Sequence, residues 1–267
     1  MTKEMILITG ASAGIGATYA DRFAKRGHDL ILVARDKARM EALAARLIEE
    51  NGISVEVLQA DLSDAADLGH VERRLREDGG ITMLVNNAGM AGGGPAATAD
   101  PDRLETLIRL NVLAFTRLAA AAASGFAARG RGAIVNIGSV TALFADQFEP
   151  TYPATKAFVL AFSQALHSEL QPQGVRVQVV LPGATRTEIW ERSGHSLDDL
   201  PAEIVMDVHE MVDAALAGLD MGEVVTIPAL PDIADWRQLE DARRKLVPNL
   251  SLRHSAARYG VAPALVD

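Results

Sequence analysis

The sequence has no cysteine, and this absence excludes several kinds of chemistry. None of the 267 residues can form a disulfide, act as a thiolate nucleophile or bind a metal through sulfur. The histidines show no metal-ligand spacing, so we expect no metal. They are His28, His70, His167, His195, His209 and His254.

Long apolar runs and clusters of positive charge are also missing from the pattern. We find no apolar run that approaches the length needed to span a bilayer, and the N-terminal Met-Thr-Lys-Glu leads straight into a short apolar segment. The net charge is −9 and the basic residues are scattered. This distribution argues against nucleic acid as the main partner. We therefore expect a cytoplasmic protein with neither a membrane nor a nucleic acid as its partner.

What is present is a regular alternation of short apolar runs with amphipathic segments. The expected strands are Met5–Thr9, Leu30–Ala34, Val55–Gln59, Met83–Asn86, Ala133–Ile137 and Val175–Leu181, with Glu223–Ile227 at a sheet edge. The expected helices are Ile15–Arg26, Lys37–Glu50, Asp64–Asp78, Asp102–Arg129 and Tyr152–Gln171. Continuously apolar strands are typical of a parallel sheet buried on both faces. The alternation predicts an α/β fold, a doubly wound, mainly parallel sheet in a single domain.

The single domain is expected to span residues 1–267, with a core at about 5–227 and a C-terminal extension at about 228–267. Two segments of the extension, Ile233–Lys245 and Leu252–Tyr259, have helix-like patterns. The extension covers either the pocket or an oligomer interface, and the sequence does not distinguish these alternatives.

A glycine-rich segment follows the first strand and opens the first helix. Its glycines allow a tight turn and a close approach to a pyrophosphate, whose charge then faces a helix N-terminus. An ordinary tight turn with a glycine-rich cap is the alternative. The residues expected to bind a nucleotide here are Gly10, Ser12, Gly14, Ile15 and Gly16.

The end of the second strand predicts which dinucleotide is preferred. An acidic residue at this place bonds the ribose 2′-hydroxyl, whereas arginine accommodates a 2′-phosphate. Here Arg35 follows the strand, Lys37 and Arg39 add positive charge, and Asp36 partly offsets it. Asp29 precedes the strand and lies at the wrong end. We expect NADP(H) to be preferred over NAD(H), which stays a second candidate; a solvated charge run that opens the second helix is the alternative.

Two further strand ends carry candidate nucleotide contacts. Asp61 ends the third strand, where it accepts a hydrogen bond from the adenine amine or else caps the helix that follows. Asn86, Asn87, Ala88 and Gly89 end the fourth strand. The amides are expected to brace neighbouring strands while Ala88 and Gly89 let the cofactor approach, although an ordinary Asn/Gly turn has the same sequence.

Tyr152 and Lys156 are four residues apart, a spacing that places both on one face of a helix. A phenol titrates near pH 10 and is a poor acid or base at neutrality. An ammonium group at about 4 Å, at an effective dielectric of about 20, stabilises the phenolate by roughly 4 kcal/mol, or roughly three pKa units. That shift would bring Tyr152 close to neutrality, where a general acid/base works best. Alone, the spacing equally fits a helix surface with a solvated lysine.

Taken together, these motifs resemble the short-chain dehydrogenase/reductase family in its compact, single-domain form. The resemblance extends from about Met5 to Thr187. It rests on Thr9–Gly16, Asn86–Gly89, Asn111, Ser139, Tyr152, Lys156, Pro182, Gly183 and Thr187. It implies a Rossmann-type sheet and hydride transfer between a nicotinamide and a carbonyl or alcohol. Many NADPH-preferring members have a basic residue inside the glycine turn, where this chain has Ala13, so the phosphate preference depends chiefly on Arg35.

The resemblance also implies a role for each catalytic residue. Tyr152 donates a proton to the carbonyl oxygen, Ser139 bonds the same oxygen, and Lys156 lowers the tyrosine pKa and bonds the nicotinamide ribose. Asn111 holds a water that connects the lysine to solvent. The residues that pass beside the nicotinamide are Pro182, Gly183 and Thr187.

The substrate pocket is expected between the loop 140–151 and the segment from Ala184 to about Met206. Leu143, Phe144, Phe148, Ile189 and Trp190 make these segments apolar, and Glu149 and Glu188 are candidate polar contacts. Core or lid packing explains the aromatic residues equally well. The pocket predicts a moderately hydrophobic carbonyl compound.

The resemblance further suggests a homodimer or homotetramer through the two long helices. Their small residues, Ala119–Ala123, Ala154, Ala157, Ala161 and Ala165, suit either an interface or packing inside one subunit. Three functions compete: an NADPH-dependent carbonyl reductase, a nucleotide sensor without chemistry, and an isomerase or dehydratase that uses the same tyrosine.

Overall fold

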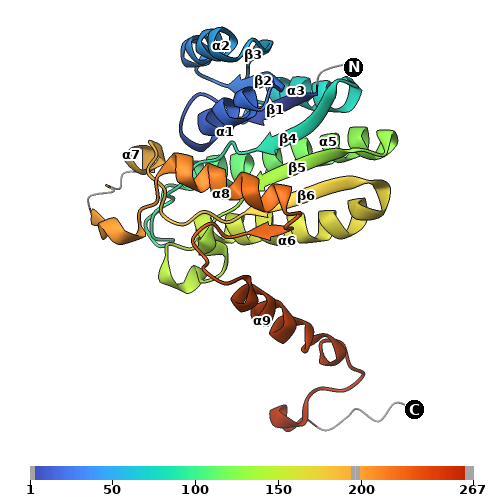
Figure 1. The fold of residues 1–267 in the computed structure, drawn as a ribbon. Coiled ribbons are helices and arrows are strands. Elements are labelled where there is room, and N and C mark those ends of the chain that lie inside the picture. Colours follow the sequence, from blue (N-terminus) through green and yellow to red (C-terminus); the bar gives the residue numbers. More distant parts are fainter. Residues whose placement is uncertain (1–3, 194–195, 197–198, 262–267) are drawn as a thin grey trace. The chain divides into compact units, whose positions relative to one another are not determined.

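A computed structural model of the protein describes residues 4–193, 196 and 199–261 (Figure 1). The described chain divides into two compact units, Met1–Pro228 and Ala229–Asp267. The first unit holds a seven-stranded sheet in the order β3-β2-β1-β4-β5-β6-β7, and every neighbouring pair is parallel. The strands are β1 (Met5–Thr9), β2 (Asp29–Ala34), β3 (Val55–Gln59), β4 (Ile81–Asn86), β5 (Gly132–Ile137), β6 (Val175–Val180) and β7 (Val225–Thr226). This sheet confirms the predicted doubly wound fold, with β7 at the edge.

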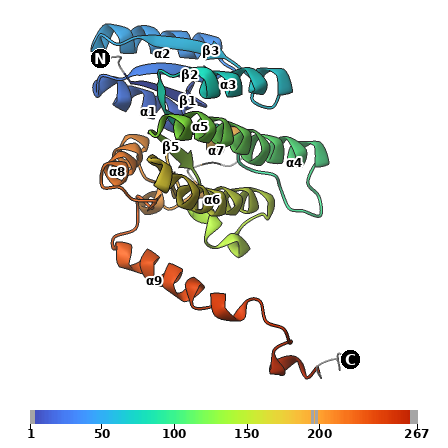
Figure 2. The ribbon, with the colours of Figure 1, turned by 90° about the vertical axis from the view of Figure 1, so that its right-hand side faces the viewer.

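In the first unit, helices connect successive strands and cover both faces of the sheet (Figure 2), whereas the last α-helix of the described chain, α9, belongs to the second unit. The helices are α1 (Gly14–Lys25), α2 (Lys37–Asn51), α3 (Ala65–Glu77), α4 (Pro101–Ile108), α5 (Phe115–Arg129), α6 (Thr151–Leu170), α7 (Ile189–Ser193), α8 (Val208–Asp220) and α9 (Ile233–Arg244). One buried apolar cluster joins α1, α2 and α8 to the sheet, and a second joins α3, α5 and α6 to it. Strands β1, β2, β4, β5 and β6 place buried residues in both clusters, so these strands are apolar on both sides, as their sequences predicted.

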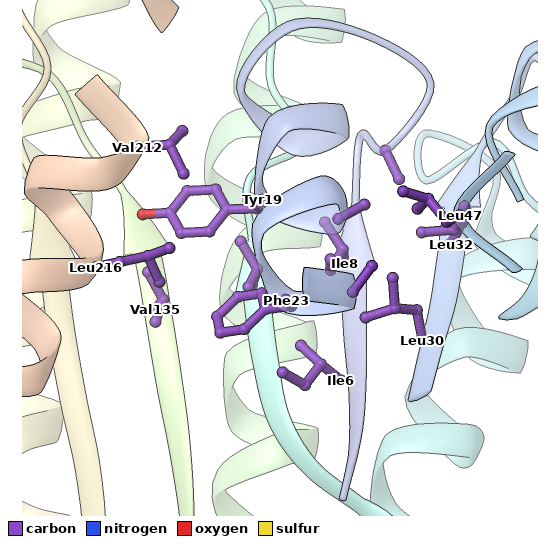
Figure 3. Packing of buried hydrophobic residues seen from close by; sticks show 14 of the residues in the cluster. Ile6, Ile8, Tyr19, Phe23, Leu30, Leu32, Leu47, Val135, Val212 and Leu216 are labelled. Carbon is purple, nitrogen blue, oxygen red and sulfur yellow. The ribbon is translucent and has the colours of Figure 1, made fainter. Parts of the chain in front are cut away.

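Tyr19 shows how tightly the first of these clusters is packed. Its ring stacks at 5.9 Å from that of Phe23, and Val212 and Leu216 of α8 lie beside it (Figure 3). Its hydroxyl is buried without a hydrogen-bond partner, and burial raises the Tyr19 pKa well above its usual value. The burial of the large ring therefore offsets the cost of one buried hydroxyl without a hydrogen bond.

Helix α8 was missed in the sequence, although its pattern is regular. Asp207 caps it by accepting hydrogen bonds from the backbone N–H groups of His209 and Glu210, at 2.8 and 3.3 Å. Its buried residues are Met211, Val212, Ala215, Leu216, Gly218 and Leu219. This three- and four-residue spacing is that of a helix with one apolar face, and the capping aspartate marks its start.

Two other expectations are wrong. The segment Leu252–Tyr259 is not a helix and contains only the short 3-10 turn Ala257–Tyr259. Leu252 and Tyr259 are exposed, so no packing offsets the cost of nucleating a helix there.

The expectation about apolar length also fails. The continuous helical stretch Pro101–Arg129 is long and apolar enough to cross a membrane by length and composition, with a mean hydropathy of 1.3 over its best window. Of that window, 56% is buried inside the protein. A buried core helix meets the same criterion, so the stretch by itself points only weakly to a membrane.

Candidate active site

The carboxyl ends of β1 and β4 meet where the chain order reverses, which is the usual ligand crevice of an open parallel sheet. The hydroxyl oxygen of Thr9, at the end of β1, accepts hydrogen bonds from the backbone N–H groups of Asn87 and Ala88 at 2.9 and 3.0 Å. The Asn87 amide donates to the Thr9 carbonyl at 2.8 Å, and the Asn86 amide donates to the Phe115 carbonyl at 2.9 Å. The contacts with Thr9 fix the Asn86–Gly89 turn against β1, and the contact with Phe115 fixes it to the start of α5.

The glycine-rich turn owes its residues to close packing as well as to backbone conformation. Gly10 and Gly14 have positive φ values of 65° and 54°, which favour glycine. Gly16 lies inside α1, yet a Cβ there would stand 2.4 Å from the Gly10 carbonyl oxygen and 2.7 Å from Asn87 Nδ2. Its role is therefore to let α1 approach β1. A Cβ on Gly14 would meet the Thr187 methyl group at 3.2 Å, so the segment after β6 closes against the same turn.

The start of α1 suits an anionic group. Its N-cap, Ala13, provides no side-chain hydrogen bond, and the first turn contains no acidic residue. Arg35, at the carboxyl end of β2, is exposed on the same edge of the sheet. The uncapped N–H groups at the start of α1 fit a pyrophosphate, and the Arg35 guanidinium fits a ribose phosphate. Ser12 and Ile15 lie in this turn, half-buried.

Asp61 does not cap the third helix, which settles one alternative. Asp64 is the N-cap of α3 and accepts hydrogen bonds from the backbone N–H groups of Ala66 and Asp67 at 2.8 and 3.0 Å. The Asp61 carboxylate instead accepts from the backbone N–H of Ser63 at 2.9 Å. Its predicted contact with an adenine stays a prediction.

The segment after β6 runs beside this edge of the sheet. The Pro182 carbonyl accepts a hydrogen bond from the Val140 N–H at 3.0 Å, which ties the segment to the loop after β5. Gly183 has open space where a Cβ would lie. The Arg39 Nη1 group of α2 donates to both carboxylate oxygens of Glu188, at 2.9 and 2.7 Å. Glu188 belongs to the segment expected to line the substrate pocket, and Arg39 to the positive charges expected near the cofactor phosphate. Their ion pair therefore joins the two predicted binding regions.

Ser139, Tyr152 and Lys156 are brought together by the loop after β5 and the first turn of α6. Ser139 directly precedes the 3-10 turn Val140–Ala142, and its hydroxyl lies near enough to that of Tyr152 to act on the tyrosine pKa. Lys156 Nζ lies 5.7 Å from the centroid of the Tyr152 ring and donates a hydrogen bond to the Ile137 carbonyl at 2.9 Å. The arrangement unites a hydroxyl donor, a phenol and a buried cation.

The electrostatics differ from the sequence-based expectation. Burial raises the pKa of Tyr152, and the Ser139 hydroxyl acts in the opposite direction. Burial lowers the pKa of Lys156 to about 8. The expected lowering of the tyrosine pKa by roughly three units is absent here, because desolvation disfavours both charged forms and Lys156 is directed at the Ile137 carbonyl.

Asn111 lies in a π-helical turn, Arg109–Ala114, that joins α4 to α5. Its side-chain oxygen accepts from the Met90 N–H at 2.9 Å, and its amide donates to the Met90 carbonyl at 2.9 Å and to the Thr155 hydroxyl at 3.2 Å. A Cβ on Gly89 would lie 3.1 Å from the same oxygen. Both amide hydrogens are thus used to fix the segment after β4 to α6, and the expected water relay stays a prediction.

The structure describes only part of the expected walls of the substrate pocket. In the second wall segment, residues 194–195 and 197–198 lie outside the described residues, and His195 is one of these. Leu143, Phe144 and Phe148 are exposed, and the two phenylalanine rings lie 5.6 Å apart. Glu149 accepts a hydrogen bond from the Gly94 N–H at 2.9 Å, and Trp190 donates from its indole to the Thr185 carbonyl at 2.9 Å. Glu149 and Trp190 therefore hold loops together.

Three contributors to the site were not singled out in the sequence. They are the hydroxyl oxygen of Thr9, named before only as the start of the glycine-rich motif, and the side chains of Thr141 and Thr155, which bond Asn87, Ser139 and Asn111 respectively. Each lies next to a singled-out motif, so a hydroxyl beside a catalytic or turn residue is the signal that would have found them. Within the described part of the chain, no group of three or more His, Asp or Glu side chains could hold a metal ion.

Comparison with known proteins adds a family. The family described as "short chain dehydrogenase" matches residues 4–198. A solved short-chain dehydrogenase from Sphingobium yanoikuyae, in complex with NADPH, is 56% identical, with a TM-score of 0.93 and coverage of 96% of this chain and 99% of that one. The bulky-bulky ketone specific alcohol dehydrogenase from Comamonas testosteroni is 50% identical, with a TM-score of 0.89 and coverage of 97% and 99%.

Curated relatives are more distant. Human 17-beta-hydroxysteroid dehydrogenase type 3 is 36% identical over 189 residues, which are 69% of this chain and 60% of that protein. The very-long-chain 3-oxoacyl-CoA reductase of Anas platyrhynchos is 32% identical over 196 residues, 72% of this chain and 63% of that protein. The match thus spans less than two thirds of the length of either of these relatives.

Proposed function

Because the chain belongs to the short-chain dehydrogenase/reductase family, we propose that it is an NADPH-dependent oxidoreductase that interconverts a carbonyl and a secondary alcohol. Its substrate is a moderately hydrophobic small molecule. The observation that carries this proposal is the grouping of Tyr152 with Ser139 and the buried Lys156. A nucleotide sensor would have no use for a phenol placed between a hydroxyl donor and a buried ammonium group.

The residues divide the chemistry of reduction among them. The nicotinamide, when bound, supplies the hydride that forms the new C–H bond. Tyr152 donates its phenolic proton to the carbonyl oxygen as the C=O bond becomes a C–O single bond, and Ser139 donates a hydrogen bond to the same oxygen. The raised pKa keeps the proton on Tyr152 at neutral pH, the state that reduction requires. Lys156, with a pKa of about 8, is mostly charged at pH 7 and stabilises the phenolate that remains.

The proposed cofactor preference rests on Arg35. No acidic side chain occupies its place at the end of β2, and an arginine there accommodates a 2′-phosphate. The pyrophosphate would be held by the turn from Gly10 to Gly16, and the nicotinamide half by the Pro182, Gly183 and Thr187 segment. The complex of the Sphingobium relative with NADPH supports the same preference.

The proposed substrate is a ketone with two bulky substituents. Leu143, Phe144 and Phe148 expose apolar surface on the loop between Ser139 and Tyr152. Such surface favours large apolar groups on either side of a carbonyl held at Tyr152. The ketone specificity in the name of the Comamonas relative, and the steroid substrate in that of the human one, support this class.

We also propose a cytoplasmic homodimer or homotetramer built on α5 and α6. Ala119, Ala121, Ala122 and Ala123 are buried within the subunit, so the alternative of internal packing holds for them. Other small residues are available: Ala120 and Ala165 are exposed and line a groove between the two helices that also includes Phe162. An apolar groove between two long helices suits a second copy of the same helices.

The decisive experiment measures oxidation of NADPH, and of NADH for comparison, by wild type and Tyr152→Phe over a panel of bulky and small ketones, aldehydes and quinones. We expect the wild type to turn over, with bulky ketones preferred. We expect kcat to fall by about 10²–10⁴-fold in the variant, with NADPH binding unchanged because the ring is retained.

Several outcomes would contradict the proposal. Binding of NADPH without turnover of any carbonyl would favour the sensor. Conversion of a substrate without net NADPH consumption would favour an isomerase or dehydratase. Full activity of Tyr152→Phe would remove the tyrosine from the mechanism.

A further inference from the structure

Thr141 contacts the oxygen of Ser139 twice. The backbone N–H of Thr141 donates to Ser139 Oγ at 3.2 Å, and the Thr141 hydroxyl lies 3.0 Å from the same atom. Ser139 is only 8% exposed, so water has little access to this oxygen. The state of the Ser139 hydroxyl is therefore set largely by its protein neighbours, Thr141 on one side and Tyr152 on the other.

The direction of these hydrogen bonds follows from what each group can donate. A serine hydroxyl has one hydrogen and two lone pairs. The Thr141 N–H can only donate, so it occupies one lone pair. If Ser139 gave its hydrogen to Thr141, it would present its remaining lone pair to Tyr152 and to the substrate oxygen. Carbonyl reduction builds negative charge on that oxygen, and such charge requires donors.

We propose that Thr141 is a positioning residue for Ser139: its N–H and its hydroxyl fill both acceptor sites of Ser139 Oγ, so that the single serine hydrogen is donated toward Tyr152 in the free enzyme and to the substrate oxygen when a carbonyl compound is bound. This inference rests on the proposed function. Two groups of one residue thereby fix the polarity of the chain from Thr141 through Ser139 to Tyr152. The same polarity serves the phenolate that remains after proton transfer, because that phenolate also accepts from Ser139.

The local fold does not need the Thr141 hydroxyl for its own stability. The turn is already closed by backbone hydrogen bonds, from the Val140 N–H to the Pro182 carbonyl at 3.0 Å and from the Ala142 N–H to the Ser139 carbonyl at 3.1 Å. Among the described residues, the hydrogen-bond partner of this hydroxyl is Ser139. Valine has nearly the same shape as threonine, so it can replace the residue with the loss of one donor only.

The test compares Thr141→Val and Thr141→Ser in the wild-type and Ser139→Ala backgrounds, with a ketone that the wild type reduces. We expect Thr141→Val to lower kcat about tenfold, the loss typical of one hydrogen bond to a charged group. KM and the NADPH Kd should stay within about twofold, because the shape and the cofactor contacts are retained. Thr141→Ser restores the donor and should keep at least about half of the wild-type kcat.

The Ser139→Ala background separates positioning from structure. Thr141→Val should have no further effect there, because the oxygen on which it acts is gone. An equal loss in both backgrounds would overturn the inference, as would wild-type activity of Thr141→Val or a loss of kcat accompanied by weaker NADPH binding and a lower melting temperature. A wild type that binds NADPH but reduces no carbonyl would overturn the proposed function, and this inference with it.

Discussion

Burial of Lys156 in the active site destabilises its charged form and thereby lowers the stability of the folded protein. It is 7% exposed, and burial lowers its pKa from 10.5 to about 8. Between these two pH values the unfolded protein binds more protons at this residue than the folded protein does, so its contribution to stability rises with pH across the window. Below pH 8 the penalty is fully present. A functional cation is thus expected to reduce stability at neutral pH.

Lys156→Met should reveal this penalty through its pH dependence. The unfolding free energy of wild type relative to the variant should increase by roughly 3 kcal/mol between pH 7 and pH 10.5. Urea denaturation followed by circular dichroism at a series of pH values measures it. The comparison of two pH values cancels the constant loss of the hydrogen bond to Ile137.

Lys37→Met is the matched control, since Lys37 is 57% exposed at its side chain on the surface of α2. Because this side chain is not buried, its removal should not produce the rise of roughly 3 kcal/mol that desolvation of Lys156 predicts. Absence of this rise for Lys156→Met as well would mean that the lysine is solvated in the folded protein.

At this scale, the sequence predicts which groups meet but not how they ionise. The four-residue spacing correctly places Tyr152 and Lys156 in the same turn of α6. The pKa directions depend on the burial of both groups and on the Ile137 carbonyl, which lies at the end of β5, 19 residues before Lys156. Similarly, Asp61 and Asp64 both precede a helix, and only the backbone geometry shows that Asp64 is the cap.

At the scale of elements, the contact of α1 with the end of β1 depends on Gly16. A Cβ there would stand 2.4 Å from the Gly10 carbonyl oxygen, a backbone atom that cannot turn aside. Gly16→Ala should therefore destabilise the protein by about 1–3 kcal/mol and weaken NADPH binding, because the glycine turn must shift. Urea denaturation and cofactor fluorescence titration measure the two effects.

Gly79→Ala is the control for this substitution. Gly79 has no heavy atom within 4 Å of an added Cβ and is exposed. It should retain the stability and the NADPH affinity of wild type. If Gly16→Ala matched it in both measurements, the close approach of α1 to β1 would not matter for the site.

Strands and helices differ in how well the sequence predicts them here. The strands of the sheet were found because both faces are buried and their runs are continuously apolar, and β3 was bounded correctly at Val55–Gln59. Helix α8 was overlooked because it follows an irregular segment of the chain, although its cap and apolar face are clear. The helix predicted at Leu252–Tyr259 does not form, because an apolar periodicity stabilises a helix only where there is a surface to pack against.

At the scale of the whole molecule, the proposed assembly depends on the groove between α5 and α6. Ala165 is exposed and lines this groove, so an arginine there would place a charge and a long side chain in the proposed interface. Ala165→Arg should convert the dimer or tetramer into smaller species, because a buried unpaired charge is costly. Sedimentation velocity at several protein concentrations measures this change.

Ala45→Arg makes the same change on an exposed position of α2, outside the groove. This variant should have the same sedimentation coefficient as the wild type. A wild type that sediments as a monomer at all concentrations would refute the assembly itself, whereas equal behaviour of both variants would place the interface elsewhere.

The π-helical turn Arg109–Ala114 makes the number of residues in this stretch important, in addition to their chemistry. A π turn takes more residues than an α turn, so α4 and α5 are joined with a phase difference within one continuous helical stretch. Loss of a single residue here would restore an even helix and rotate one half against the other by about 100°. Asn111 would then face away from Met90 and Thr155. The length of this stretch is therefore as much a part of the active site as any side chain, and substitutions alone would never reveal it.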